Sequence, residues 1–259
     1  VPPGLTNSFV HFIASGANHM LVLLDSGEML AVTSAYGWPT PGNGNNVLAR
    51  DSLQTCSVDS QVIQGTTQYL CIGWAGSGSV PASGSSNSFT FMLTNASALT
   101  WLWNTNYWLN LQSETNGYIN KSAGWYSAGT NLNLQAYPSN YYHFDCWTGT
   151  LVSTSNPYWI TVSGPKSILA KYAEDMATYS TPQWWLIQHG LPTNDIGALY
   201  DDGDGMPAWQ EYFADTDPMD TNSVLRITTI STESGGLRLQ WVGGIEANQY
   251  LEGRTNLAA

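Results

Sequence analysis

The sequence predicts a mainly β protein, built from tandem small β-repeat domains with a short helix–loop–helix insert and a C-terminal partial β-sandwich. Its 259 residues include 12 Trp and 14 Tyr but only 10% charged residues, a composition that favours strands over helices. Several short segments alternate apolar and polar residues with a period of two, as half-buried strands do. Two segments about 70 residues apart also share aromatic and glycine positions, which indicates a repeat.

The chain is acidic, with 7 Lys and Arg against 19 Asp and Glu and a net charge of −12. Such a charge repels phosphate backbones and anionic membrane surfaces, so we expect no nucleic-acid partner. No apolar run approaches the roughly 18 residues that a membrane helix needs, so we expect no membrane span. The opening "VPPGLTNSFV" lacks a signal peptide. We expect that a leader was removed or that the chain was cut from a longer one.

Residues 1–30 contain two apolar runs, "FVHFIA" and "HMLVLL", separated by "SGAN" and followed by the turn "DSGE". These runs predict a pair of strands. Together with the connector "VPPGLTN" and the turn "IASGANH", they resemble one blade of a regulator-of-chromosome-condensation type propeller. One blade cannot close a propeller, so the resemblance implies a remnant or a strand pair that another unit uses.

Residues 31–109 and 110–173 are predicted to be two degenerate copies of one β-repeat. The matching positions are Tyr69 with Tyr142, Trp74 with Trp147, and Gly76 with Gly149. The second copy, with "GWYSAGTNLNLQAYP" and "YHFDCWTG", resembles the divergent internalin B-type bacterial repeat, and the first copy matches it more loosely. The resemblance implies small β-rich modules that serve mainly as spacers or adhesive segments of secreted and surface proteins.

Three tryptophans in "LTWLWNTNYW" invite two interpretations. Trp101 and Trp103 lie on one face of a predicted strand, and Trp108 lies close by. If these side chains are exposed, they form a platform on which sugar rings stack, and the protein binds carbohydrate. The alternative is that each repeat builds a small apolar core around its tryptophans.

The chain has three cysteines, of which Cys56 and Cys71 lie in the strand-like runs "LQTCSV" and "QYLCIGW". If these strands are neighbours, a disulfide would close a loop of about 15 residues and stabilise the fold by roughly 3 kcal/mol. We predict this disulfide because other features favour an extracellular protein. The alternative is two buried thiols, and Cys146 is left unpaired in both cases.

Residues 174–181 form a predicted linker, after which residues 182–222 contain two short helices. The first helix is expected in "QWWLIQH", with Ser180 or Thr181 as N-cap, Pro182 in the first turn and Gly190 as the stop. The second is expected in "PAWQEYFA". Between them lies the acidic stretch "DDGDGMP".

The acidic stretch has the spacing of a 12-residue calcium loop, which supplies oxygen ligands from positions 1, 3, 5, 7 and 12 and needs glycine at 6. With Glu211 at position 12, Asp202 is at 3, Asp204 at 5 and the Met206 carbonyl at 7. Position 1 falls on Tyr200, so another acid must replace it. The predicted calcium ligands are Asp201, Asp202, Asp204, Met206, Glu211 and Asp217, with Asp215 and Asp220 as further candidates for the missing position.

The segment 182–222 resembles half of an EF-hand or dockerin, or a thrombospondin type 3 calcium loop, as found in secreted proteins of environmental bacteria. The resemblance implies a helix–calcium loop–helix module with calcium as its cofactor. Because Tyr200 departs from the pattern, we expect a dissociation constant of about 10⁻⁴ to 10⁻³ M, as in extracellular modules. The alternative interpretation is a solvated Asp–Gly turn without an ion.

Residues 223–259 return to a strand pattern in "VLRITTI", "GLRLQWV" and "QYLEGRT". They resemble the first strands of a fibronectin type III-like sandwich, which needs more strands than this segment supplies. Both ends of the chain therefore look like incomplete β-units. Unpaired strands with apolar faces associate readily.

No motif of the G-x-S-x-G or H-E-x-x-H kind occurs, and none of the four histidines lies in a catalytic context. We therefore expect no enzyme; dispersed acids leave a glycoside hydrolase as the least favoured alternative. The favoured hypothesis is a secreted or cell-surface structural and adhesive protein, stabilised by calcium. It would form a homo-oligomer, polymer or filament when one subunit adds strands to the next. The alternative is a carbohydrate-binding module whose partners are polysaccharides or cell-surface components.

Overall fold

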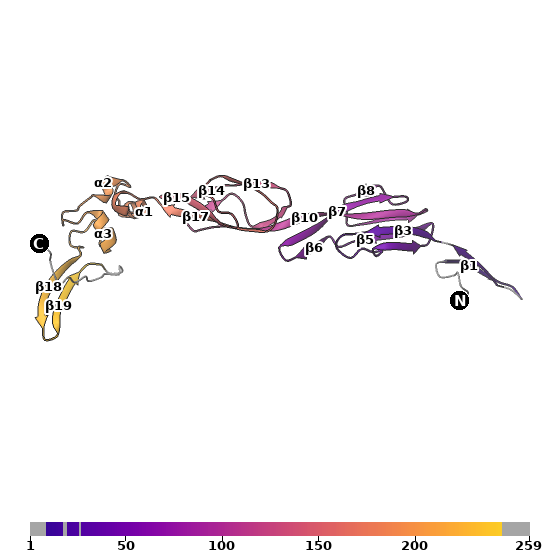
Figure 1. Cartoon of the computed structure of the whole chain (residues 1–259), viewed down its shortest axis with the longest axis horizontal. Coiled ribbons are helices and arrows are strands. Elements are labelled where there is room, and N and C mark those ends of the chain that lie inside the picture. The colour runs from indigo at the N-terminus through magenta and orange to yellow at the C-terminus, as the bar shows by residue number, and fades with distance from the viewer. Residues whose placement is uncertain (1–8, 18–19, 26, 245–259) are drawn as a thin grey trace.

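The computed structural model describes residues 9–17, 20–25 and 27–244. Figure 1 shows a mainly β molecule whose units follow one another along the long axis, which confirms the predicted fold class. Within these residues, no helix has the length and apolar character needed to cross a membrane.

The N-terminal strand pair is an antiparallel hairpin of β1 (Phe9–Ser15) and β2 (Met20–Asp25). Among the described strands, β1 and β2 pair only with each other. The hairpin matches the two strands expected in residues 1–30. The connector "VPPGLTN", on which the propeller resemblance partly depends, lies outside the described residues, and that resemblance stays a prediction.

Two repeats follow. The strands of the first are β3 (Glu28–Thr33), β4 (Gly44–Leu48), β5 (Ser52–Ser57), β6 (Gln61–Gln64), β7 (Thr67–Ser77), β8 (Ser83–Gly84), β9 (Ser88–Leu93) and β10 (Ser97–Ser113). The second continues with β11 (Gly117–Ile119), β12 (Gly124–Ser127), β13 (Asn131–Leu134), β14 (Ala136–Pro138), β15 (Tyr142–Gly149), β16 (Tyr158–Thr161) and β17 (Lys166–Glu174).

The 17-residue strand β10 belongs to both repeats. Its first half runs parallel to β3 and antiparallel to β7. Its second half runs antiparallel to β12 and parallel to β17. Because β17 pairs with β15 as β10 pairs with β7, the same arrangement occurs twice. One continuous strand therefore joins the two repeats, and in Figure 1 they lie in line.

The tryptophans that align in the sequence occupy equivalent places in the two repeats. Trp74 in β7 donates a hydrogen bond from Nε1 to the carbonyl of Pro81 at 3.3 Å, and Trp147 in β15 donates one to the carbonyl of Ser155 at 2.9 Å. Both side chains are buried. Gly149 lies where the Ser167 carbonyl leaves no room for a side chain, and its φ of +97° favours glycine.

Each repeat has its own apolar core. The first contains Leu30, Val32, Cys56, Val58, Trp74, Val80, Phe91, Leu93, Leu99 and Trp101. The second contains Leu109, Leu111, Leu132, Leu134, Ala136, Trp147, Ile160, Val162, Ile168, Ala170 and Tyr172. The boundary predicted at 109/110 falls inside β10, where Leu109 already packs in the second core.

The helical module begins with a 3-10 turn (Thr178–Ser180) and contains α1 (Gln183–Gln188), α2 (Asp195–Ala198) and α3 (Ala208–Ala214). The helices α1 and α3 were expected, whereas α2 was missed. The predicted N-caps of α1 are wrong. Pro182 holds that position, and the Thr181 hydroxyl donates to the Thr178 carbonyl instead. The module has a third core, made by Trp185, Leu186, Leu191, Ala198 and Ala208.

The C-terminal unit is an antiparallel hairpin of β18 (Arg226–Glu233) and β19 (Gly236–Val242). Within the described residues these two strands pair only with each other. The third predicted strand, residues 249–255, lies outside the described residues. Apolar side chains of the hairpin are exposed, Leu237 by 70% and Ile230 by 62%.

Replacing the tryptophan at the centre of the second core tests this assignment of the repeats. Trp147 is fully buried, so Trp147→Ala should lower the free energy of unfolding by about 3 to 5 kcal/mol through the cavity it leaves. The matched control is Trp159→Ala, because Trp159 is 65% exposed on β16; it should change stability by less than about 0.5 kcal/mol. Chemical denaturation measures both, and similar losses for the two variants would contradict the assignment.

Candidate metal centre

The acidic loop lies between α2 and α3 and is closed by the backbone. The N–H of Ala208, at the start of α3, donates to the carbonyl of Tyr200 at 2.8 Å. The buried Ala198 and Ala208 on either side pack in the core of the module. The loop is thus held at both ends, and its carboxylates are brought together by the fold.

Two aspartates shape the loop through side chain to backbone bonds. Asp201 Oδ1 accepts the N–H groups of Gly203 at 2.8 Å and Gly205 at 3.2 Å, and Asp204 Oδ1 accepts the N–H of Met206 at 2.7 Å. Gly203 and Gly205 have φ of +113° and +89°, a region that favours glycine. Aspartate commonly makes such turns, so these bonds alone do not indicate a metal.

Four other carboxylate oxygens are shielded from solvent without a well-formed hydrogen bond. They are both oxygens of Asp202, Oδ2 of Asp204 and Oε2 of Glu211, and only a weak contact from the Asp204 backbone N–H favours the charged form of Asp202. Asp201, Asp202 and Asp204 also offer oxygens that all lie within 4.8 Å of one another. Buried charged oxygens without a partner are strongly destabilising, so this arrangement calls either for protonation of these acids or for a cation between them.

Glu211 is the buried acid of the site. It projects from α3, is 0% exposed, and its Oε1 accepts a hydrogen bond from the Thr216 hydroxyl at 3.2 Å. Burial, and then the negative charge of Asp204, raise its pKa from 4.5 to about 7, while the bond from Thr216 opposes the shift. Asp202 and Asp217 raise the same pKa further, so Glu211 lies within electrostatic range of all three aspartates.

The pKa of Asp202 is also raised, first by desolvation and then by the charge of Asp204. The backbone N–H of Asp204 opposes the shift, while Asp201 and Asp220 add smaller effects that raise the pKa. The acids of the loop therefore oppose one another's ionisation, as carboxylates that share one site do.

The predicted ligands differ in whether their carboxylate oxygens already have hydrogen-bond partners. Asp202, Asp204 and Glu211 carry the partnerless oxygens. Asp201 is exposed and shapes the turn, and Asp217 Oδ1 accepts the N–H of Met219 at 3.1 Å. Sequence reasoning missed Thr216, the partner of Glu211, because nothing in the spacing marks a hydroxyl five residues after the last acid.

Burial excludes Trp101 from the predicted sugar platform. Trp101 is 2% exposed and packs edge to face against Trp74, with ring centroids 6.0 Å apart. Trp103 is half-buried against the same core, and its Nε1 donates to Ser34 Oγ at 3.1 Å. Trp108 packs edge to face with Trp125. The three rings are used in packing, which is the alternative left open by the sequence.

The predicted disulfide is also absent. Cys56 and Cys71 are free thiols, on strands that belong to different sheets: β5 pairs with β9, and β7 with β6, β8 and β10. Burial raises the pKa of Cys56 to about 11, so it stays a thiol. The alternation pattern predicted both strands correctly but not which strands are neighbours.

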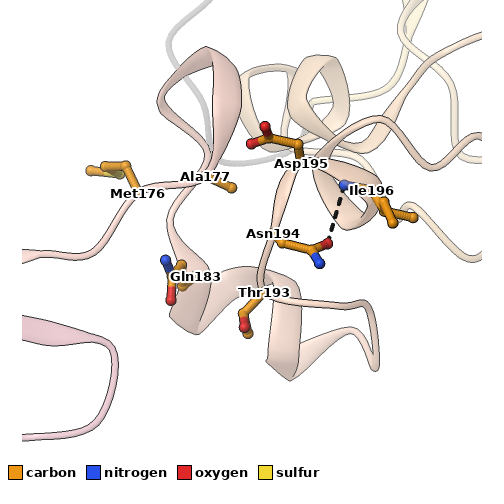
Figure 2. A pocket seen from close by; sticks show the side chains of 7 residues that line it. All are labelled: Met176, Ala177, Gln183, Thr193, Asn194, Asp195 and Ile196. Atoms are coloured by element: carbon orange, nitrogen blue, oxygen red, sulfur yellow. Dashed lines mark hydrogen bonds between the residues drawn. The ribbon is translucent and has the colours of Figure 1, made fainter.

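An open hollow of about 410 Å³ lies beside the module, lined in part by Met176, Asn194, Asp195 and Ile196 (Figure 2). Two of its polar side chains are already used. Asn194 Oδ1 caps α2 by accepting the N–H of Ile196 at 3.1 Å, and Asp195 Oδ1 accepts the N–H of Thr178 at 3.0 Å. Gln183 and Thr193 are the remaining polar side chains of the lining, so the hollow offers a ligand few polar groups.

Comparison with known proteins supports the repeat assignment. Residues 107–176 match the family described as a divergent InlB B-repeat domain. The match begins within β10 and ends just after β17, so it contains the predicted second repeat, 110–173. No curated protein and no solved structure matches this chain. The family is typical of bacterial surface and extracellular proteins, and the matched segment is similar to a domain of that type.

The raised pKa of Glu211 predicts how stability depends on pH when a chelator removes free cations. Folded Glu211 binds a proton up to about pH 7, whereas its ordinary pKa is 4.5, so the folded state holds more protons in this window. The free energy of unfolding should therefore fall as the pH rises from about 4.5 to about 7, by up to about 1.4 kcal/mol per pH unit.

Urea denaturation at a series of pH values measures this slope, and Glu211→Gln should flatten it. Glu114→Gln is the control, because Glu114 is 40% exposed beside Lys171 and its loss should leave the slope in place. If the free energy of unfolding of the wild type does not change with pH in this window, or rises with pH, the raised pKa of buried Glu211 is contradicted.

Proposed function

We propose that the chain is an extracellular, non-enzymatic structural and adhesive segment, in which β-repeats act as a spacer and calcium stabilises the helical module. The observation that carries the calcium part is the set of four buried carboxylate oxygens without partners on Asp202, Asp204 and Glu211. The shared strand β10 and the match to a B-repeat family support the spacer part.

Calcium fits these residues better than a transition metal does. The groups that gather here are carboxylates, and hard cations such as calcium prefer oxygen ligands, whereas zinc and copper favour histidine and cysteine. Calcium also tolerates irregular geometry and takes six to eight oxygens. Asp202, Asp204 and Glu211 would hold the ion, and the Met206 carbonyl and Asp217 are the candidates for further ligands.

The ion would stabilise the fold of the helical module and would take no part in a reaction. Glu211 belongs to α3 and Asp202 to the loop, so one cation between them joins the helix to the loop. Because the acids oppose one another's ionisation without a cation, the free energy of binding becomes free energy of folding for the module.

Added calcium should therefore raise the melting temperature. With a dissociation constant of about 10⁻⁴ to 10⁻³ M, about 10 mM calcium should stabilise the module by about 1.4 to 2.7 kcal/mol over the chelated form. Asp202→Asn should remove most of this gain, while Asp51→Asn, at a side chain that is 71% exposed in the first repeat, should keep it. Scanning calorimetry measures the difference, and equal melting in calcium and in chelator would contradict the calcium part.

Self-association is the second part of the proposal. The hairpin β18–β19 pairs with no other described strand, and it exposes Ile230, Leu237 and Trp241 by 62%, 70% and 54%. Open strand edges with apolar side chains add strands from other chains. With the hairpin β1–β2 near the other end of the molecule (Figure 1), a second copy of this chain is the proposed occupant, and head-to-tail contacts give filaments.

Light scattering and electron microscopy of the full chain in calcium test this association. The wild type should increase in mass with concentration, and Leu237→Asp should stay monomeric. Leu53→Asp alters a residue 67% exposed on β5, far from the hairpin in the sequence, and should assemble as the wild type does. A monodisperse monomer at high concentration in calcium would refute assembly and leave the calcium site untouched.

A further inference from the structure

A second open hollow, of about 460 Å³, lies on the first repeat, between the loop after β3 and strand β6. Two aromatic side chains, Tyr36 and Trp38, and three polar ones, Asp59, Gln61 and Gln64, are among those that line it. Its volume lies within the range of small-molecule binding sites. Its mixture of aromatic and uncharged polar groups differs from the hollow in Figure 2.

Trp38 is 86% exposed, yet its backbone is firmly held. Its N–H donates to Asp59 Oδ2 at 3.0 Å. The preceding Gly37 has φ of +68°, and a Cβ there would lie 3.1 Å from the ring of Trp103, so the loop lies directly on the core. Single exposed apolar residues are common, but a large ring presented on an anchored backbone binds without the cost of ordering the loop that carries it.

The floor of the hollow is equally well ordered. Tyr36 stacks on Tyr69 with ring centroids 3.6 Å apart and planes at 11°. The edge of Trp103 packs against Tyr36 at 5.9 Å, and Trp103 is fixed by its hydrogen bond to Ser34. The aromatic residues around the hollow are therefore tied to the first core through Trp103.

One polar side chain of the hollow, that of Gln61, is oriented by a hydrogen bond with a residue outside the lining. Gln61 Oε1 accepts a hydrogen bond from Gln68 Nε2 at 2.7 Å, and Gln68 Oε1 in turn accepts one from Asn106, which is 8% exposed. This chain of bonds leaves the Gln61 amide nitrogen as a free donor. The side-chain amide of Gln64 makes no hydrogen bond within the described residues, so both its donor and its acceptor are available to a ligand.

We propose that this hollow binds neutral polysaccharide, with one pyranose ring stacked on Trp38 and its hydroxyls bonded to Asp59, Gln61 and Gln64. A pyranose has an apolar face of C–H groups and a rim of hydroxyls that both donate and accept. A flat indole beside amides and a carboxylate complements these two features. Asp59 is the charged group among the lining residues, and the chain carries −12, so acidic sugars are repelled.

This assignment is independent of the calcium site and of self-association, since none of its residues belongs to the helical module or to the terminal hairpins. It adds a ligand to the first repeat. The sugar-binding face therefore differs from the one that the sequence indicated: Trp101 and Trp103 support the core beneath the hollow, and Trp38 on the loop above presents the ring.

Titration of the full chain with laminarin and with galactomannan, followed by tryptophan fluorescence and affinity electrophoresis, tests the proposal. At least one of these neutral polysaccharides should bind, and Trp38→Ala should weaken that binding at least about tenfold, or by about 1.4 kcal/mol. Trp159→Ala is the matched control, because Trp159 is 65% exposed in the second repeat; it should leave the affinity unchanged.

Gln64→Ala provides a second variant, since Gln64 makes no bond that the fold needs, and it should weaken binding several-fold with an unchanged melting temperature. Polygalacturonate serves as the acidic probe and should not bind. The proposal is overturned if neither neutral polysaccharide binds the wild type, if Trp38→Ala binds as well as the wild type, or if polygalacturonate binds instead.

Discussion

The helical module depends on the electrostatics of a few carboxylates that the fold removes from water. Asp202, Asp204 and Glu211 carry four shielded oxygens without a hydrogen-bond partner, while Asp201 is satisfied by the backbone of its own turn. Burial and like charge together raise the pKa of Glu211 to about 7. A protein can accept such an arrangement if the acids stay protonated or if a cation joins them, and the proposed calcium ion is the second solution.

A different constraint governs the rest of the molecule, namely that one strand belongs to two cores. Leu99 on β10 packs in the first core and Leu109 in the second, so bending between the repeats would break strand pairing with β7 or β12. A continuous strand makes the junction between the two repeats stiffer than a flexible linker would. This stiffness suits a spacer. Trp38 is exposed on the surface of the first repeat, beside β6, where the proposed neutral polysaccharide would have access to it.

Sequence patterns predicted the β class, the matching positions Trp74 and Trp147, and the acids of the loop, because periodicity and spacing are local properties. They failed where the outcome depends on which strands become neighbours. Alternation places Trp101 and Trp103 on one face but does not say whether that face is inside, and the same limit explains the missed separation of Cys56 and Cys71. The helix α2 was missed because it has a single turn, although Asn194 is a recognisable N-cap. The hollow at Trp38 depends on the contact of the loop after β3 with Asp59 and β6, more than 20 residues further along the chain, which no local pattern records.

The most direct measurement of the central claim is the number of calcium ions that the folded chain binds, obtained by equilibrium dialysis at millimolar free calcium and neutral pH. Because Asp202 and Asp204 lie in one cluster of carboxylates and Glu211 lies within electrostatic range of both, the account predicts saturation at one ion per chain for this site and its loss when Glu211 is replaced by Gln. Retention of no calcium by the wild type, or the same retention by the Glu211→Gln variant, would contradict it.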